Sequence, residues 1–569
     1  MAAPGAGSSR LPAIDLLRGF IMVVMAWDHV KDGTAEFMGM DNTKPGDPPF
    51  QRNNHTHSPA WYGTEEAYSG SWGWFLARAV SHICAPGFSY LMGIGMVLLT
   101  AARMDEHRMR RSYNALPWTR GAVLRFFMLR GLLIIALGFA VRTAETLRLI
   151  DPPPDAKSFI GYETGFFQVM TCLGLQMIVA APLVCQIVSS IQTSRAVAAN
   201  GANAPLLVGG AEYAEALLEK SPATQRRESE QYHETVAARG ALAAQHEAWQ
   251  VILLLLGLTS FIVTNAVVEA HWVDGAPPVY GNATHFAPPH STSPLDIAMR
   301  FVVLPGPFND GKSRDLYPLF GWLGFCLWGV AAGLDFWLKP AKAEKRTKVA
   351  GIALLVCFLL VRGCFGRYGN LRGWPIGEGG NSTAAKSIAF FNVCKYPPSL
   401  AYALITLGVV QLLLVGLRKM AAADQAVAAR AAALAPVAQG EGATVGADGA
   451  KLASRGWLSP GHPSSPAQGQ VQPQGIGRFW SILRARALVV LLAYGRSPLF
   501  FYMAHFPLIV ILEVIAYAAQ GSPPDRKGVP IWVSFLLWLC VVLPVMYAAT
   551  RRYGQFKATT GPNSLWRFL

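Results

Sequence analysis

Residues 11–31 read LPAIDLLRGFIMVVMAWDHVK, an apolar run that carries Asp15, Arg18, Asp28 and His29. A plain membrane anchor would carry leucine at such positions, because ionisable side chains inside a bilayer are costly and usually face a bundle interior or a wet cavity. At about 100° per residue, a helix brings Arg18 and His29 back to nearly the same direction. The run therefore predicts a membrane helix with a polar stripe that faces inward.

The two ends of this stripe differ in chemistry. Arg18 carries a guanidinium and His29 an imidazole, and at a rise of about 1.5 Å per residue they are separated by roughly 16 Å. A bilayer core is about 30 Å thick, so the two groups can lie near its opposite sides. We therefore expect this helix to form one wall of a reaction path, with Met22 and Met25 between the two groups.

The composition of the whole chain is that of a polytopic membrane protein. Of its 569 residues, 52% are hydrophobic and 15% are charged, and the mean hydropathy is +0.30. These values are too apolar for a soluble protein of this length. The net charge is +15, but the basic residues cluster at the ends of apolar segments, as orientation signals do. We therefore do not expect nucleic-acid binding.

Ten apolar segments are long enough to cross a bilayer, which takes about 20 helical residues. They lie at 12–31, 74–102, 122–141, 164–190, 249–268, 317–337, 349–364, 397–417, 497–519 and 530–549. The shorter apolar run 485–496 is predicted to be a re-entrant or interfacial piece, because Gly495 and Pro498 would break it from the next span. The predicted fold class is all-α and polytopic.

Loop charges predict the orientation of the chain. Lysine and arginine gather at 103–120 and 339–348, which places both loops on the cytoplasmic side. With ten spans, the N- and C-termini are both expected there. The glycosylation sequons at Asn54, Asn282 and Asn381 fall in loops on the opposite side, as N-glycosylation requires.

Two long polar connections interrupt the apolar core. Residues 191–248 are compatible with a solvated helix on the cytoplasmic side, and residues 420–480 run into a disordered linker rich in Gly, Pro, Ser and Gln. The membrane core is thereby divided into spans 1 to 4 at 1–190, spans 5 to 8 at 249–419, and spans 9 and 10 with a basic tail at 481–569.

Six motifs mark the membrane core in order: RLPAIDLLRG followed by MAWDH, then RAVSHICAPGFSYLMG, FFQVMTCLGL, YPLFGWLGFCLWGVAAG, KYPPSLAYALITLG and GRSPLFFYMAHFPLI. In this order they resemble the heparan-alpha-glucosaminide N-acetyltransferase-like membrane proteins, part of a broader superfamily of transmembrane acyltransferases. The resemblance covers essentially the whole membrane core. It implies helices around a central pore, acetyl-CoA entering from the cytoplasm, and an acceptor sugar bound on the luminal or outer face.

The resemblance implies that His29 is the histidine of the acyl-transfer centre, at the spacing from Arg18 seen in related O-acyltransferases. Imidazole suits this role, because its unperturbed pKa lies nearest to neutrality and it can take a proton from an attacking amine or hydroxyl. The structural alternative is a polar helix-end residue in the interfacial region. Asp28 lies about 100° away on the helix and is predicted to tune a neighbouring group rather than to orient His29.

The animal branch of the resembled family differs at this position. There an asparagine replaces His29, and a luminal histidine in the motif His-x-x-Trp is thought to be catalytic. The nearest counterpart in this sequence runs from His57 to Trp61 with a different spacing. His57 is therefore the alternative catalytic base.

Further ionisable residues lie in the second and ninth spans. Arg78 and His82 are four residues apart and are predicted to face the same way, with His82 among the catalytic candidates and Arg78 with His505 on the acceptor side. The alternative is a structural polar cluster with Asp28. A metal site made of His29, His82, His505 and Asp28 is not predicted, because the spacings match no helix-borne zinc motif.

The CoA phosphates are predicted to bind Arg18, Arg125 and Arg130 at the cytoplasmic mouth, because guanidinium groups bind phosphate oxygens bidentately. Arginines at this end of a span are also topology determinants. Arg18 is the arginine that a role in topology alone explains least well, because it pairs with Asp15 at i, i+3 and lies on the same helix face as His29.

The sequence thus predicts a membrane-bound acyltransferase that moves an acetyl group from cytoplasmic acetyl-CoA to an amine or hydroxyl of a sugar across the membrane. The expected partners are acetyl-CoA, the carbohydrate acceptor and the lipid bilayer, and a homodimer is left open. The alternatives are a proton-coupled small-molecule transporter, disfavoured by the lack of a hydropathy repeat between the halves, and a non-catalytic family member. The expected location is a lysosomal or plasma membrane in a eukaryote, or the inner membrane in a bacterium.

Overall fold

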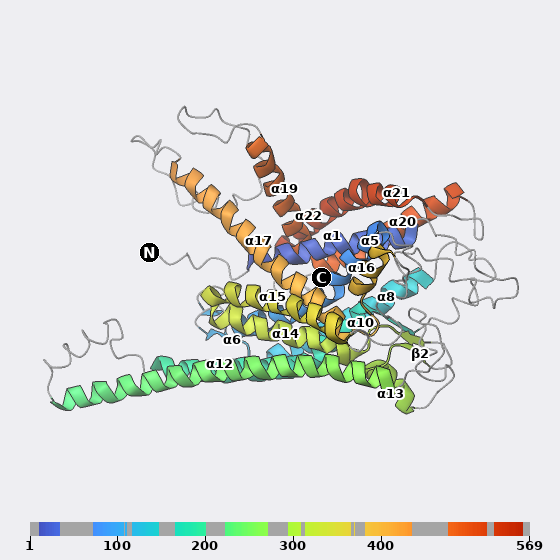
Figure 1. Ribbon diagram of the computed structural model, residues 1–569. Coiled ribbons are helices and arrows are strands. Elements are labelled where there is room, and N and C mark those ends of the chain that lie inside the picture. The colour runs from blue at the N-terminus through green and yellow to red at the C-terminus, as the bar shows by residue number, and fades with distance from the viewer. Residues whose placement is uncertain are drawn as a thin grey trace, which may run out of the picture.

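The computed structural model describes residues 11–34, 72–106, 109–110, 116–146, 165–200, 222–270, 294–308, 313–365, 369, 382–434, 476–520 and 529–560. Over these residues the protein is built from helices, with three strands of three residues each. Most of the long helices run side by side in a bundle, and α17 and α19 slant out of it at one end (Figure 1).

In chain order, the helices are α1 (Pro12–Thr34), α5 (Trp72–Ala79), the 3-10 turn η2 (Val80–Ile83), α6 (Cys84–Met104), α8 (Arg120–Thr146), α10 (Val169–Asn200), α12 (Pro222–Ala270), α13 (Pro294–Val302), α14 (Leu319–Leu338), α15 (Pro340–Phe365), α16 (Thr383–Phe391), α17 (Leu400–Leu434), α19 (Ile476–Arg496), α20 (Pro498–Gln520), α21 (Ile531–Leu536), the π-helix η6 (Leu537–Val542) and α22 (Leu543–Thr559).

Nine helices within the described part of the chain are long and apolar enough to cross a membrane. They coincide with nine of the ten predicted spans. The remaining predicted span, the first in the chain, is α1. It has 23 residues, but charged side chains such as Asp15, Arg18 and Asp28 interrupt its apolar run. The protein is therefore an all-α polytopic membrane protein, as its sequence predicts.

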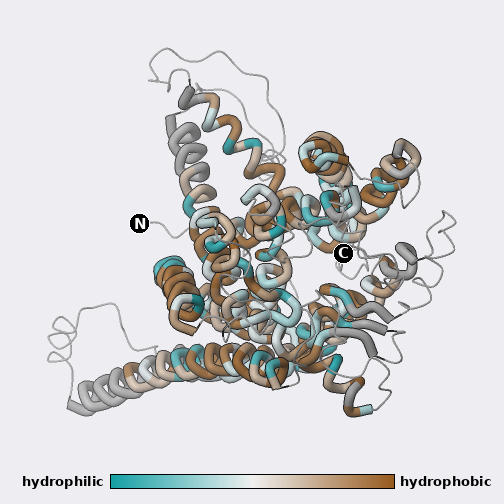
Figure 2. Tube along the Cα trace, turned by 45° about the vertical axis from the view of Figure 1, so that its right-hand side comes forward, coloured by the Kyte–Doolittle hydropathy of each residue, from teal (hydrophilic) through white to brown (hydrophobic). Residues whose placement is uncertain are grey.

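Hydrophobic side chains also cover the outer surface of the bundle. Figure 2 shows apolar residues along most of its helices. Leu255 on α12, Leu360 on α15 and Ile515 on α20 are each more than half exposed. In water such faces would make an aggregating surface, whereas around a bundle of spanning helices they contact lipid.

Helix α1 lies in the interior of this bundle. Pro12 opens it, Asp15 lies in its first turn and Lys31 in its last, an order that suits the helix dipole. Leu17, Ile21 and other apolar residues along it are fully buried. The helix packs against α6, α17, α19 and α20, so the stretch with the most unusual sequence is also the centre of the fold.

The segment 485–496, predicted to be a re-entrant or interfacial piece, belongs to a helix that begins earlier than its apolar run. It is the C-terminal part of α19, which has 21 residues, and the helix ends at Arg496 before Pro498. It crosses α1 with backbone touching backbone: a Cβ added at Gly19 would lie 1.9 Å from the carbonyl oxygen of Leu491. At Gly495 the same addition would come within 1.7 Å of a carbonyl oxygen of α1. This approach requires glycine on both helices.

A small sheet brings the starts of two spans together. Strand β1 (Gly165–Phe167) precedes α10, and β2 (Gly306–Phe308) and β3 (Ser313–Asp315) precede α14. β3 lies in the middle, parallel to β1 and antiparallel to β2. The sheet thereby holds Asp315 and the residues after it at one end of α14.

The polar connection between the fourth and fifth predicted spans is partly an extension of its neighbouring helices. α10 continues to Asn200, and α12 begins at Pro222 and runs unbroken for 49 residues. The N-terminal part of α12 projects beyond the other helices of the bundle (Figure 1). Farther along the helix, residues of α12 pack against α14, and Glu247 of α12 pairs with Arg346 of α15.

Candidate functional site

A pair of histidines lies where α1 meets α20. The Nδ1 atom of His29 is 2.7 Å from Nε2 of His505, and the two rings are stacked with their centres 5.0 Å apart. His505 is fully buried, two residues before the proline that interrupts the hydrogen bonding of α20. Both histidines are candidates from the sequence, but their contact is not predicted by it.

Backbone carbonyls decide which ring nitrogens carry hydrogen in this pair. The Nδ1 atom of His505 lies 2.6 Å from the carbonyl oxygen of Tyr502 and 3.1 Å from that of Phe501. Because a carbonyl oxygen only accepts, Nδ1–H of His505 must donate, and in a neutral ring Nε2 then accepts from Nδ1–H of His29. In a neutral His29 the lone pair is consequently on Nε2.

A buried charge cluster surrounds Asp28 on the same end of α1. Its carboxylate forms a hydrogen-bonded ion pair with the buried ammonium of Lys31. The charge of Lys395, from the segment before α17, also acts on Asp28. Asp28 is therefore paired with Lys31 and lies within the electrostatic range of Lys395.

The pKa of Lys395 is raised despite its burial. Removal from water alone would lower the pKa, but the neighbouring Tyr396 and the carboxylate of Asp28 outweigh that effect. Lys395 is therefore an ammonium at neutral pH. Its Nζ lies 5.0 Å from the centre of the Tyr396 ring and is hydrogen-bonded to the side chain of that tyrosine.

Arg78 and His82 extend this cluster from the start of the second span. Arg78 lies in the last turn of α5 and donates from Nη1 to Oδ1 of Asn392 over 3.1 Å. His82 lies in the 3-10 turn that follows, and its charge interactions are with Arg78, Lys395 and the Asp28 pair. Its Nε2 is buried without a hydrogen-bond partner among the described residues, which leaves a polar atom for a ligand or water to satisfy.

Tyrosine hydroxyls lie beside the same cluster. The hydroxyls of Tyr317 and Tyr396 are 2.8 Å apart. Tyr402 donates its hydroxyl to the carbonyl oxygen of His82 over 2.8 Å. Tyr502, the residue that anchors His505, interacts electrostatically with Tyr317 and contacts the ring of His29 edge to face. The histidine pair, the Asp28 cluster and the tyrosines therefore form one site.

A second polar place lies toward the other end of α1. Arg18 donates to Asp15 over 3.1 Å, as the i, i+3 spacing predicts, and its guanidinium faces Gly95 of α6. Arg130 of α8 is close enough for the two guanidinium charges to repel each other. Arg130 has no carboxylate partner among the residues that the structure describes. Two cations thus lie within electrostatic range of each other, and Arg18 is paired with Asp15.

The third arginine of the predicted phosphate site is placed apart from this pair. Arg125 is exposed on α8. Five residues of helix turn the chain by about 500°, so Arg125 points roughly 140° away from Arg130. The structure therefore brings together Arg18 and Arg130, and leaves Arg125 on another face.

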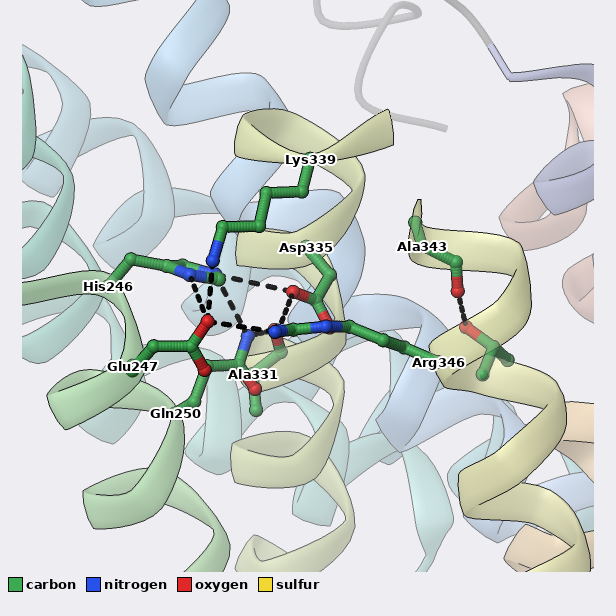
Figure 3. Close-up of polar contacts among 9 residues, drawn as sticks. His246, Glu247, Gln250, Ala331, Asp335, Lys339, Ala343 and Arg346 are labelled. Atoms are coloured by element: carbon green, nitrogen blue, oxygen red, sulfur yellow. Dashed lines mark hydrogen bonds and ion pairs between the residues drawn. The ribbon is translucent and has the colours of Figure 1, made fainter. Parts of the chain in front are cut away.

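The sequence analysis missed a third polar cluster, which joins α12, α14 and α15 (Figure 3). His246 is buried, with Nε2 3.3 Å from Asp335 and Nδ1 3.7 Å from Glu247. Glu247 also accepts from Lys339 over 2.5 Å and from Arg346 over 2.8 Å. Asp335 lies near the end of α14, and Tyr317 lies just before its start, so this cluster is far from the histidine pair.

Several candidates from the sequence lie outside the described residues. These are His57 and the sequon residues Asn54, Asn282 and Asn381. Among the described residues, no group of three or more His, Cys, Asp and Glu side chains could hold a metal ion. The site is therefore built from histidines, tyrosines and charged pairs.

Sequence reasoning missed Lys31 and Lys395 as site residues, and it interpreted the segments that begin at Tyr317 and Tyr396 first of all as helix starts. The last three stand at the beginnings of two motifs of the membrane core, YPLFGW and KYPPS. The prolines of these motifs indicate helix starts, and that signal draws attention away from the polar residues before them. Lys31 follows Asp28 at i, i+3, the same signal that predicts the pair of Asp15 and Arg18.

Comparison with known proteins gives no match, because neither a protein-family model nor the sequence of a curated protein is significantly similar to this chain. The resemblance to the heparan-alpha-glucosaminide N-acetyltransferase-like proteins stays a prediction from the six motifs.

Proposed function

We propose that the protein is a membrane-bound acyltransferase that moves an acetyl group from acetyl-CoA to an amine or hydroxyl of a sugar on the other side of the membrane. The observation that carries this proposal is the hydrogen bond between His29 and His505. It leaves the lone pair of a neutral His29 on Nε2, the form that a general base needs. His505 acts as a positioning residue for that base.

Transfer requires three things from the protein. The acceptor must lose a proton as its nitrogen or oxygen bonds to the acetyl carbonyl carbon, and His29 is suited to take that proton. The thiolate of CoA must leave and be protonated, which the same imidazole can do by returning the proton. The acceptor must be held in place, and Arg78 and the Nε2 atom of His82 offer polar groups for it.

The pair of Arg18 and Arg130 is suited to the phosphates of CoA. Two guanidiniums that repel each other gain from an anion placed between them, and each can donate two parallel hydrogen bonds to phosphate oxygens. Helix geometry separates Arg18 from His29 by roughly 16 Å. An extended acyl-CoA chain could bridge that distance, with its phosphates at one end of α1 and its thioester at the other.

The test uses sealed vesicles that contain the purified protein, radiolabelled acetyl-CoA on the side of Arg18 and glucosamine on the other side. We expect label on glucosamine with the wild type. His29→Ala should lower the rate by about 10² to 10⁴, the usual contribution of a general base. Loss of activity only in His57→Ala would move the base to that residue.

Arginine variants test the donor end of the same reaction. Arg130→Gln should raise the KM for acetyl-CoA by about tenfold or more, because hydrogen bonds between charged groups contribute about 1.5–3 kcal/mol. Arg125→Gln is the matched control, on the same helix and pointing elsewhere, and should leave the KM unchanged. Equal effects of the two variants would contradict the paired phosphate site.

The rival function is a proton-coupled transporter. The observation that favours it is His246, an ionisable side chain buried inside the bundle next to the carboxylates of Asp335 and Glu247. Vesicles in which no label reaches glucosamine and CoA does not bind, while a pH gradient drives solute uptake, would overturn the acyltransferase. Vesicles with neither activity would favour the non-catalytic family member.

A further inference from the structure

A chain of hydrogen bonds runs from Lys395 through Tyr396 to Tyr317. The ammonium of Lys395 is bonded to the side chain of Tyr396, and the hydroxyl of Tyr396 lies 2.8 Å from that of Tyr317. Tyr317 stands before α14, and the other two residues stand before α17. Two segments about 80 positions apart therefore meet through this contact of hydroxyls and the edge-to-face packing of the two rings.

The ammonium fixes the direction of this chain. An ammonium has hydrogens but no acceptor, so Lys395 donates to the hydroxyl oxygen of Tyr396. Tyr396 can then direct its own hydrogen to the oxygen of Tyr317, and Tyr317 is left to donate outward. Each donor polarises the next, so the final hydroxyl is a stronger hydrogen-bond donor than an isolated tyrosine.

The end of the chain stays protonated and held in place. Burial raises the pKa of Tyr317 far above its usual value. The ring of Tyr317 packs against Trp322 with centres 4.8 Å apart. The backbone N–H of Tyr317 donates to Asp315 over 2.7 Å. A rigid donor costs little to align when charge develops nearby.

Tyr502 connects this donor to the histidine pair. Tyr317 interacts electrostatically with Tyr502, and Tyr502 contacts the rings of both His29 and His505. Tyr502, whose ring contacts the ring of His29, is thus the side chain through which the tyrosine donor and the base belong to the same site. Acyl transfer needs both groups, a base on the nucleophile and a donor on the carbonyl oxygen.

We propose that Tyr317 is a catalytic residue of the proposed acetyl transfer that donates a hydrogen bond to the acetyl carbonyl oxygen, with Tyr396 and Lys395 as its positioning residues. This role rests on the proposed acyltransferase function. The six motifs do not predict this role, because their two tyrosines stand first of all before helix-opening prolines.

In the proposed transfer, one bond forms to the acetyl carbon and one bond from it breaks. The acceptor nitrogen or oxygen forms a bond to the carbonyl carbon of acetyl-CoA while His29 takes its proton. The carbonyl electron pair moves onto oxygen, where Tyr317 stabilises it without giving up its proton. When that pair re-forms the carbonyl, the carbon–sulfur bond breaks, and the thiolate receives the proton from His29.

The first variant is Tyr317→Phe in the full-length protein, assayed with acetyl-CoA and glucosamine in sealed vesicles. The ring and its packing on Trp322 are retained, and only the hydroxyl is lost. We expect kcat to fall by about 10² to 10³, the usual effect of removing one such donor. The KM for acetyl-CoA should stay unchanged, because the phosphate contacts are at the other end of α1.

Variants of the other two residues separate catalysis from folding. Tyr396→Phe and Lys395→Met should each lower kcat by about tenfold or more, since each removes a hydrogen bond that polarises Tyr317. Lys395→Arg keeps a donor and should restore much of the rate. Tyr494→Phe is the matched control, because its hydroxyl donates to the carbonyl oxygen of Leu543 over 2.7 Å and is not part of the chain from Lys395 to Tyr317. It should keep the wild-type kcat.

The outcomes distinguish this role from the function on which it rests. A wild type that acetylates glucosamine, with Tyr317→Phe as active as Tyr494→Phe, would overturn the role of Tyr317 and leave the acyltransferase standing. A raised KM with unchanged kcat in Tyr317→Phe would also overturn it. A wild type that transfers no label would overturn both.

Discussion

Asp315 shows how strongly burial acts on a single carboxyl group in this protein. It ends strand β3 with 2% of its surface exposed, and one backbone N–H, that of Tyr317, donates to it. Burial raises the pKa of Asp315 from 3.8 to about 8, and the hydrogen bond offsets only part of that rise. At neutral pH the folded protein therefore holds a proton on this carboxyl that the unfolded chain would release.

This proton makes stability depend on pH. Between about pH 4 and pH 8 the folded state binds more protons than the unfolded state, so the contribution of Asp315 is complete below pH 4 and is lost as pH rises through 8. Asp315→Asn keeps an oxygen acceptor and cannot ionise. We expect it to raise the unfolding temperature at pH 8.5 and to change it little at pH 5, measured by thermal unfolding in detergent. An equal change at both pH values would refute the buried-proton account.

Residue identities were easier to predict from the sequence than residue contacts. His29, His82, Arg78 and His505 stood out because ionisable side chains are rare in apolar runs. Their grouping could not be predicted, because His29 and His505 are 476 positions apart and meet only when α1 packs against α20. Lys395 escaped notice, because it lies outside an apolar run, where a lysine is unremarkable.

At the scale of helices, the contact between α1 and α19 holds the site together. α19 passes over α1 at Gly19, one residue after Arg18, and Gly495 lies against the first turn of α1. No side chain fits between the two backbones. The register of α1, and with it the positions of Arg18 and His29, therefore depends on two glycines that have no chemistry of their own.

Substitution of these glycines tests that dependence. Gly495→Ala should destabilise the protein by about 1–3 kcal/mol, the usual range for overpacking, because its Cβ would overlap a backbone oxygen that cannot move aside. Gly554→Ala on α22 is the control, because nothing lies within 4 Å of its added Cβ. Thermal unfolding should show a lower transition for the first variant only. Equal transitions for both would mean that α19 moves freely on α1.

The existence of the spans was predictable from hydropathy, but their bounds were not. α12 continues to Pro222 because Ala, Glu, Gln and Arg are good helix formers that need no apolar face to extend a helix already begun. α19 was predicted too short for the converse reason, since Arg484 and Arg486 interrupt its apolar run without interrupting its helix.

At the scale of the whole molecule, the two ends of α15 can be used to determine how the protein is oriented in the membrane. Lys345 is exposed near its start, and its end is joined to α16 by Arg362, which donates to the carbonyl oxygens of Ala389 and Phe390. The sequence predicts that the lysine-rich start is cytoplasmic and that α16 is on the opposite side.

Cysteine labelling decides the orientation. In a background without the exposed Cys357, Cys364 and Cys540, Lys345→Cys should be protected from an impermeant maleimide added outside intact cells, and Thr383→Cys should react. Permeabilised cells serve as the control, in which both positions should react. Labelling of Lys345→Cys alone in intact cells would invert the predicted orientation and place the acetyl-CoA side outside.

The 49 residues of α12 have a consequence for its free end. A span uses about 20 of them, and at about 1.5 Å per residue the turns before Trp249 reach roughly 40 Å beyond the bilayer core. The field of charged lipid headgroups decays over a Debye length of about 8 Å at physiological ionic strength. Lys339 and Arg346 contact Glu247, two residues before Trp249, and so lie within the range of that field, whereas the start of α12 lies several Debye lengths beyond it.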